Sequence, residues 1–148
     1  MEVLETDRGG DVTYHGPGQI VCYPIVDLAR HKQDVHWMLR RLEAALIASL
    51  ESMGIVAGVR PGLTGVWVGE AKIAAIGIGV SRWITFHGFA LNVAPDMAHF
   101  ELIVPCGLKG LPVTCMRDLL GKTPEMSEIK REVVEQFCDI FGLKRPDA

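Results

Sequence analysis

The sequence predicts an α+β fold in which helices pack against a mixed, largely antiparallel sheet. Two segments carry the amphipathic period of a helix, and the stretch between them is divided by glycine into short runs rich in Val, Ile, Trp and Phe. One such run also precedes the first helical segment, so the order of strand, helix, several strands and helix fits helices layered on one sheet. The chain of 148 residues is expected to form a single domain, residues 1–148, around one core.

The two long helices are predicted at 34–53 and 127–141. In both segments apolar side chains recur at the i, i+3 and i+4 spacing that places them on one face. Asp34 can cap the first helix at its N-terminus. Gly54 and Gly142 stand where the two helices would end, because glycine readily takes the left-handed conformation found there. Both apolar faces should pack on the sheet.

The predicted strands are short and bounded by turn residues. One β-branched run at 20–26 precedes the first helix. The remaining strands are expected at 55–59, 64–69, 72–80 and 84–93, with turns at Pro61-Gly62, Gly69-Glu70 and near Ser81-Arg82. The region 96–126 is less regular, with a short helix at 114–120.

Composition excludes several classes of function. The hydrophobic fraction of 49% is ordinary, and charged residues or glycine interrupt every apolar run before it reaches the length of a membrane span. A net charge of −3 gives no reason to expect nucleic-acid binding. The first residues lack the basic and apolar regions of a secretory signal, so a cytoplasmic location is expected. The four cysteines form no Cys-x-x-Cys pair, and we expect neither a metal site nor a cofactor.

The segment from Arg8 to Gln19 is the first candidate binding element. It contains four glycines and a proline, a composition that a helix or a central strand does not tolerate. The segment is therefore predicted to be a shaped loop. The apolar run 20–26 follows directly, so a rigid strand would hold the end of the loop, which is a common way to build a binding site.

Two further residues are candidates for chemistry. Lys72 interrupts an apolar run, where burial would desolvate its amine and favour a role as a base. A lysine that extends its amine to solvent from the start of a strand fits the same pattern. Cys106 lies between Pro105 and Gly107 on what should be an accessible turn, which suits a structural turn or a nucleophile served by a nearby base. The other cysteines, Cys22, Cys115 and Cys138, are interpreted as structural.

Four ordered blocks closely resemble the signatures of the lipoyl(octanoyl) transferases. They are Arg8-Gly9-Gly10-x-x-Thr13-Tyr14-His15-Gly16-Pro17-Gly18-Gln19, Lys72-Ile73-Ala74-Ala75-Ile76-Gly77, Phe86-His87-Gly88-Phe89-Ala90-Leu91-Asn92-Val93 and Ile103-Val104-Pro105-Cys106-Gly107. The resemblance covers essentially the whole chain. It implies a fold like the catalytic domain of the biotin and lipoate protein ligases, and transfer of an octanoyl or lipoyl group from acyl carrier protein to a lysine of a lipoyl domain.

The resemblance also implies roles for individual residues. Cys106 would be the nucleophile that carries the acyl group as a thioester, and Lys72 would lower the pKa of that thiol. The substrate pocket would be lined by Arg8, Gly9, Gly10, Asp11, Val12, Thr13, Tyr14, His15, Ala75, Ile76, Gly77, Gly88, Phe89 and Ala90. Gly16, Pro17, Gly18, Gln19 and His87 are expected as further lining residues.

Partners follow from the same resemblance. The donor would be octanoyl-acyl carrier protein, and the acceptors would be lipoyl domains of 2-oxoacid dehydrogenase complexes and the H protein of glycine cleavage. Because these partners are generally small acidic proteins, we expect a basic docking patch drawn from Arg8, Arg30, Lys32, Arg40, Arg41, Arg60 and Arg82.

Two alternatives stay open. An ATP-dependent lipoate ligase would share the fold and the lysine but would not need the thiol of Cys106. Members of the resembled family usually carry a substantial segment before the Arg-Gly-Gly motif, and here Met1 lies close upstream of Arg8. The chain is therefore expected to be an N-terminally shortened form, and a non-catalytic remnant that binds an acyl carrier or a partner chain is the second alternative.

Overall fold

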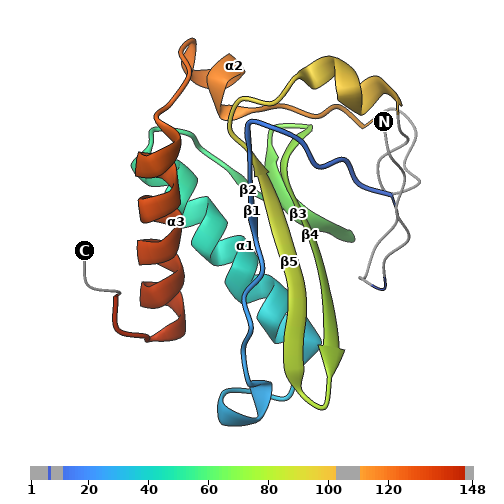
Figure 1. Cartoon of the computed structure of the whole chain (residues 1–148), viewed down its shortest axis with the longest axis vertical. Coiled ribbons are helices and arrows are strands. Elements are labelled where there is room, and N and C mark those ends of the chain that lie inside the picture. Colours follow the sequence, from blue (N-terminus) through green and yellow to red (C-terminus); the bar gives the residue numbers. More distant parts are fainter. Residues whose placement is uncertain (1–6, 8–11, 103–110, 146–148) are drawn as a thin grey trace.

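The computed structural model describes residues 7, 12–102 and 111–145 of the chain. Five strands in this part form one sheet, and two long helices pack together on it (Figure 1). The predicted α+β class is confirmed. Every strand pair is antiparallel, and the parallel component is limited, in the described residues, to one isolated bridge between Lys72 and Val113.

The strands follow the order β1-β5-β4-β3-β2 across the sheet. Their bounds are Gln19–Cys22 for β1, Gly58–Arg60 for β2, Leu63–Val68 for β3, Ala71–Ser81 for β4 and Ile84–Asn92 for β5. Three predicted strands are confirmed to within a few residues. The prediction at 20–26 is right only in its first part, because β1 ends at Cys22 and Pro24 lacks the backbone N–H that a longer strand would use. The prediction at 55–59 is placed too early.

The helices agree closely with the predicted bounds. Helix α1 covers Val35–Ser52, and the side chain of Asp34 accepts a hydrogen bond from the backbone N–H of Trp37, as a cap should. Helix α3 covers Met126–Phe141 and ends at Gly142, whose φ of 66° is left-handed. Short elements are η1 at Leu28–Arg30, η2 at Met97–Leu102 and α2 at Met116–Leu120, of which η1 and η2 were not predicted.

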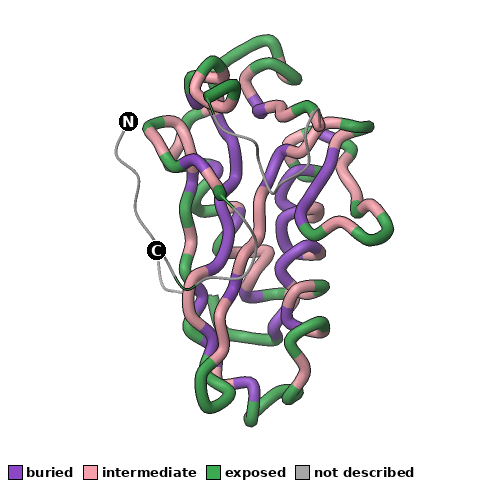
Figure 2. Tube along the Cα trace, turned by 90° about the vertical axis from the view of Figure 1, so that its right-hand side faces the viewer, coloured by how far each residue is buried: buried purple, intermediate pink, exposed green. Residues whose placement is uncertain are grey.

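The core lies between the helices and one face of the sheet. Leu42, Leu46 and Leu50 of α1 pack against Ile73 and Leu91 of the two long strands. Figure 2 shows buried positions along both the helices and the strands that enclose this core. The helices do not cover the opposite face of β4 and β5, which other segments of the chain contact instead. Among the described residues, no helix is both long and apolar enough to cross a membrane.

Candidate active site

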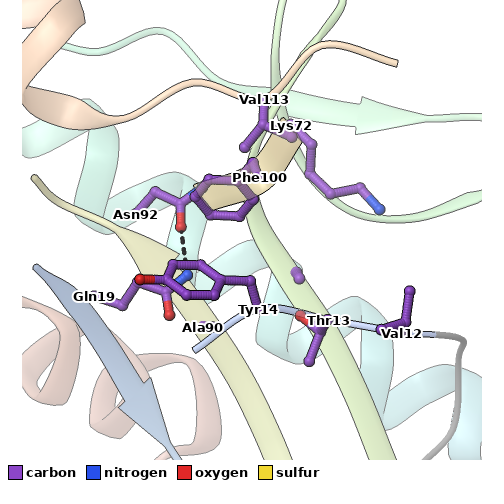
Figure 3. A pocket seen from close by; sticks show the side chains of 10 residues that line it. Val12, Thr13, Tyr14, Gln19, Lys72, Ala90, Asn92, Phe100 and Val113 are labelled. Atoms are coloured by element: carbon purple, nitrogen blue, oxygen red, sulfur yellow. Dashed lines mark hydrogen bonds between the residues drawn. The ribbon is translucent and has the colours of Figure 1, made fainter. Parts of the chain in front are cut away.

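A pocket lies at the end of the sheet where β4 begins and β5 ends (Figure 3). Ala75 and Ala90 are register partners on the two strands, and both contribute to its wall. Their neighbours Ala74 and Leu91 belong to the core, and successive side chains of a strand point to opposite faces. The pocket is therefore on the face away from α1. The other lining residues are Val12, Thr13, Tyr14, Gln19, Lys72, Asn92, Phe100 and Val113.

The glycine-rich loop is fastened to the pocket through Tyr14. This side chain is buried, its hydroxyl lies 2.8 Å from Nδ1 of His99, and its ring packs edge-on against Phe100 at 5.2 Å between centroids. Both partners belong to η2. Val12 and Thr13 form the part of the pocket wall that lies beside β4 and β5 (Figure 3). Residues 12–14 of the predicted loop thus form part of the pocket wall, and the buried side chain of Tyr14 holds them there.

A network of polar side chains lies in the part of the pocket wall that Gln19 and Asn92 form. Gln19 donates a hydrogen bond from Nε2 to Oδ1 of Asn92 at 2.8 Å, which Figure 3 draws as a dashed line. Asn92 donates in turn to the backbone oxygen of Thr114 at 3.1 Å, and Oε1 of Gln19 accepts from the N–H of Gly16 at 3.1 Å. Since Asn92 is buried, its amide needs these partners. The network ties the loop, β1, β5 and the segment around Thr114 together.

The backbone of Lys72, near the start of β4, is bonded to the segment around Val113. Its N–H donates to the oxygen of Pro112 at 2.9 Å, and its oxygen accepts from the N–H of Thr114 at 3.0 Å. This pair of bonds makes the parallel bridge to Val113. The segment that follows the Pro105-Cys106-Gly107 block in the sequence therefore adds to the sheet directly beside Lys72.

The side chain of Lys72 lies against an aromatic ring. Its Nζ is 4.9 Å from the ring centroid of Trp67, which is its register partner on β3. The guanidinium carbon of Arg60 lies 5.1 Å from the same ring. A cation over an indole face gains an electrostatic attraction, so Trp67 favours a defined position for both cations. Trp67 is itself buried, and its Nε1 has no hydrogen-bond acceptor among the described residues.

The structure brings together about a third of the predicted site residues in this pocket. Val12, Thr13, Tyr14, Gln19, Lys72, Ala75 and Ala90 all line the pocket. Arg8, Gly9, Gly10, Asp11 and Cys106 lie outside the described residues. The pairing of Lys72 with Cys106 stays a prediction, since no described distance joins them.

Several predicted lining residues lie elsewhere. The side chains of Ile76 and Phe89 are register partners that pack on the core side of the sheet, because they alternate with Ala75 and Ala90. His15 and Pro17 are exposed and do not line the pocket. The pocket lining also lacks Gly16, Gly18, Gly77, Gly88 and His87. Gly88 instead lets β1 pass close to β5, because a Cβ on this residue would meet the oxygen of Cys22 at 2.0 Å.

His87 adopts an uncommon conformation within β5. Its φ is 59°, a left-handed value that is rare for a residue with a side chain, and its ring contacts Tyr23 edge-on. Nε2 lies 2.9 Å from a carboxylate oxygen of Asp7. This hydrogen bond from His87 holds the pKa of the Asp7 carboxyl below its ordinary value. The pair marks where the start of the described chain meets β5.

Four residues of the site were not singled out by the sequence. Asn92, Phe100 and Val113 line the pocket, and His99 holds Tyr14. A usable signal existed for Asn92 alone, because an amide at the end of an otherwise apolar strand requires buried partners. His99 and Phe100 belong to the short helix η2, whose irregular sequence gave no period to follow.

The described cysteines are free thiols with structural surroundings. Cys115 and Cys138 are buried, and Cys22 lies partly buried in β1. Burial raises the pKa of the Cys22 thiol and, in the same way, that of Cys115. Neither thiol is activated by its environment, which agrees with the interpretation of both as structural. Within the described ranges no three His, Cys, Asp or Glu side chains gather as a metal site would require.

Comparison of the sequence with known families gives a match over nearly the whole chain. The profile of the lipoyl protein ligase A/B catalytic domain matches residues 1–138. A protein of Synechococcus sp. named octanoyltransferase is 52% identical over 145 residues, and one of Solibacter usitatus is 56% identical over 139 residues. A third, from Citrifermentans bemidjiense, is 47% identical over 146 residues. These alignments cover 97%, 94% and 99% of this chain, but 54%, 62% and 72% of the three relatives.

Solved structures agree on the fold. A lipoate-protein ligase A bound with ATP superimposes with a TM-score of 0.73 at 18% identity, covering 95% of this chain and 59% of that one. The apo biotin protein ligase of Aquifex aeolicus gives 0.68 at 15% identity, with 84% and 53% covered. The expected likeness to this group of folds is confirmed, and at such identities the likeness concerns the fold alone.

Proposed function

Because this chain belongs to the lipoyl protein ligase A/B catalytic domain family, and its relatives of about 50% identity are octanoyltransferases, we propose that it transfers an octanoyl group to a lysine of a lipoyl domain. The chain spans about half to three quarters of the length of these relatives. The proposed donor is octanoyl-acyl carrier protein.

The single observation that carries the proposal is the position of Lys72. Lys72 lines a pocket that residues of the glycine-rich loop also line, and its backbone is hydrogen-bonded to the segment from Pro112 to Thr114. Pro112 follows Cys106 by six residues in the sequence. The chain thus returns to Lys72 soon after the proposed nucleophile, which supports a reaction shared by the two residues.

The proposed reaction has two acyl-transfer steps. In the first, the thiolate of Cys106 attacks the thioester carbon of the donor, the carrier thiol leaves, and Lys72 takes the proton of the Cys106 thiol and returns it to that leaving thiol. In the second, the amine of the acceptor lysine attacks the enzyme thioester, an amide forms, and the sulfur of Cys106 leaves. Lys72 accepts the proton that the incoming amine loses. No external oxidant or nucleotide is consumed.

The lining of the pocket suits a saturated chain. Ala75, Ala90 and Val113 present small apolar groups, and Phe100 adds an aromatic surface. Burial of each methylene from water contributes about 0.8 kcal/mol, so a wall of this kind favours an acyl chain over a polar substituent. We propose that the acceptors are lipoyl domains of 2-oxoacid dehydrogenase complexes and the glycine cleavage H protein.

The test is intact-mass analysis after mixing with octanoyl-acyl carrier protein. The wild-type chain should gain the mass of one octanoyl group, and hydroxylamine at neutral pH should remove it, as expected for a thioester. Cys106→Ala should gain nothing, whereas the matched control Cys115→Ala should behave as the wild type. Lys72→Met should slow the gain by about a hundredfold or more, the size of a lost general base; Lys130→Met is the control on exposed surface.

Two other outcomes would contradict the proposal. Release of pyrophosphate from ATP with free octanoate or lipoate, without modification of Cys106, would indicate a ligase. A folded chain that binds the acyl carrier but gains no mass would indicate a binding protein.

A further inference from the structure

A buried carboxylate on α1 reaches the sheet directly beneath the site. The side chain of Glu43 is almost fully enclosed, with 1% of the residue exposed. Its Oε1 accepts a hydrogen bond from the backbone N–H of Gly65 at 3.2 Å, and its Oε2 pairs with the guanidinium of Arg40 on the same helix. A carboxylate is costly to bury, and a leucine would fill this place in the core without that cost. Its presence there calls for a function.

Gly65 adopts a conformation and a packing that only glycine accepts. Its φ is 120°, and a Cβ on this residue would meet the oxygen of Ala74 at 2.7 Å. The same Cβ would lie 3.5 Å from Cε and 3.7 Å from Cδ of Lys72. The backbone of β3 at Gly65 is therefore the surface on which the Lys72 side chain rests, and Glu43 fixes that surface from the opposite layer.

The ladder between β3 and β4 is irregular at this point. Val66 pairs with Ala74, while the next residue, Trp67, pairs with Lys72, so β4 contains one extra residue. Such a bulge shifts the alternation of side chains along a strand. Lys72 and Ala75 are three positions apart and would face opposite ways on a regular strand, yet both line the pocket. The bulge thus directs Lys72 into the site.

We propose that Glu43 is a positioning residue for Lys72, which it holds in the pocket by binding Gly65 beside the bulge. This inference rests on the proposed role of Lys72 in acyl transfer. Glu43 acts through the acceptor oxygen that it offers to Gly65, and Arg40 only neutralises its charge. An amide of the same shape should therefore replace the carboxylate, whereas an apolar side chain of similar size should not.

The experiment measures the position of Lys72 without requiring turnover. The chain is labelled with a trace amount of acetic anhydride, and peptide mass spectrometry gives the labelling rate of Lys72 relative to that of Lys130, an exposed residue of α3. In Glu43→Leu, Lys72 should be labelled several-fold faster, because its side chain leaves Trp67 for solvent. Glu43→Gln and Arg40→Gln, which both keep an acceptor for Gly65, should match the wild type.

Octanoyl transfer by the same variants supplies a second readout. Glu43→Leu should lower kcat by about tenfold with little change in KM for the carrier, because small misplacement of a reacting group costs rate. Glu43→Gln should keep the kcat of the wild type. An unaltered Lys72 labelling rate in folded Glu43→Leu would overturn the inference. So would altered labelling in Glu43→Gln, a test that holds even if the leucine variant does not fold. If the wild type transfers no octanoate, the proposed function fails, while the labelling still decides whether Glu43 positions Lys72.

Discussion

Tyr14 is the residue through which the glycine-rich loop is joined to η2. Its hydroxyl bonds His99, and its ring packs on Phe100 next to the pocket. We predict that Tyr14→Phe keeps the ring contact but loses the hydrogen bond, which lowers the free energy of unfolding by about 1 kcal/mol. Because the loop is then less fixed, KM for the octanoyl donor should rise more than kcat falls. Urea unfolding and steady-state transfer measure the two effects.

A matched control exists for this change in Tyr23, which is 57% exposed. Tyr23→Phe removes an equivalent hydroxyl from the surface and should alter neither stability nor KM. His99→Phe should reproduce the effect of Tyr14→Phe, and the double variant should be no worse than either single one, since both remove one shared bond. Additive losses would show that the two residues act separately.

His99 and two of the cysteines illustrate which roles of single residues could be predicted from the sequence. His99 has a structural role, but its partner Tyr14 lies 85 positions away, and a contact of that range leaves no local pattern. Cys22 and Cys138, by contrast, lie in an apolar strand and an apolar helix face, and their structural interpretation follows from those neighbours alone. Residue roles were predictable where the immediate sequence defined the environment.

The hairpin between β4 and β5 carries conformational strain. Its two central residues, Arg82 and Trp83, have φ values of 48° and 65°, the left-handed pair of a two-residue turn that usually contains Asn and Gly. We predict that Arg82→Asn raises the free energy of unfolding by about 0.5 kcal/mol, because asparagine takes this conformation more readily than arginine. Arg82→Gln removes the same charge without easing the turn, so it should give no gain in a urea titration.

The cap of α1 gives that helix a dependence on pH. The hydrogen bond from the Trp37 N–H lowers the pKa of Asp34 below its ordinary 3.8. A carboxyl with a lowered pKa in the folded state contributes stability above its unfolded value, and this contribution is lost as the pH falls through the folded value. The wild type should therefore lose Tm more steeply below about pH 4 than Asp34→Asn, which caps without titrating.

Thermal unfolding of both proteins between about pH 7 and about pH 2.5 measures this difference, since that range spans the ordinary carboxyl pKa. Near neutral pH the two Tm values should agree to within a few degrees, because asparagine is also a good cap. Asp34→Ala, which cannot cap, should be less stable than both near neutral pH. Parallel curves for the wild type and Asp34→Asn across the acid range would contradict the assignment.

Helix ends were more predictable than strand pairings. Asp34, Gly54 and Gly142 stand where the sequence placed them, since a cap depends on a few adjacent residues. The bulge opposite Val66 and Trp67 was not predicted, although it directs Lys72 to the pocket. It follows from the register of two strands, and the hydrogen bond of nearby Gly65 joins it to Glu43, twenty-two positions earlier. The α+β class follows from local periodicity, whereas the orientation of Lys72 follows from contacts between layers.

At the scale of the whole molecule, most cations of the predicted basic patch are bound by partners within the chain. Arg40 pairs with Glu43, Arg30 with Asp27 and Lys32 with Asp34, while Arg41 bonds the backbone of Ile140. Arg82 lies ten positions along β4 from Lys72, roughly 30 Å at the rise of a strand, which is several screening lengths in ordinary salt. Arg8 lies outside the described residues. Among the cations expected in the patch, Arg60 is the one that shares the Trp67 ring with Lys72.

Arg60 is therefore where an acidic carrier should meet this surface. Arg60→Gln should raise KM for octanoyl-acyl carrier protein by about two- to fivefold at low ionic strength, the size of one exposed charge pair, and the difference should shrink as salt is added. Arg82→Gln removes an equal charge from the far end of β4 and should leave KM unchanged in all salt conditions. If both variants raise KM equally, the carrier responds to net charge and not to a cation beside the pocket. If neither does, recognition of the carrier does not use this face of the sheet.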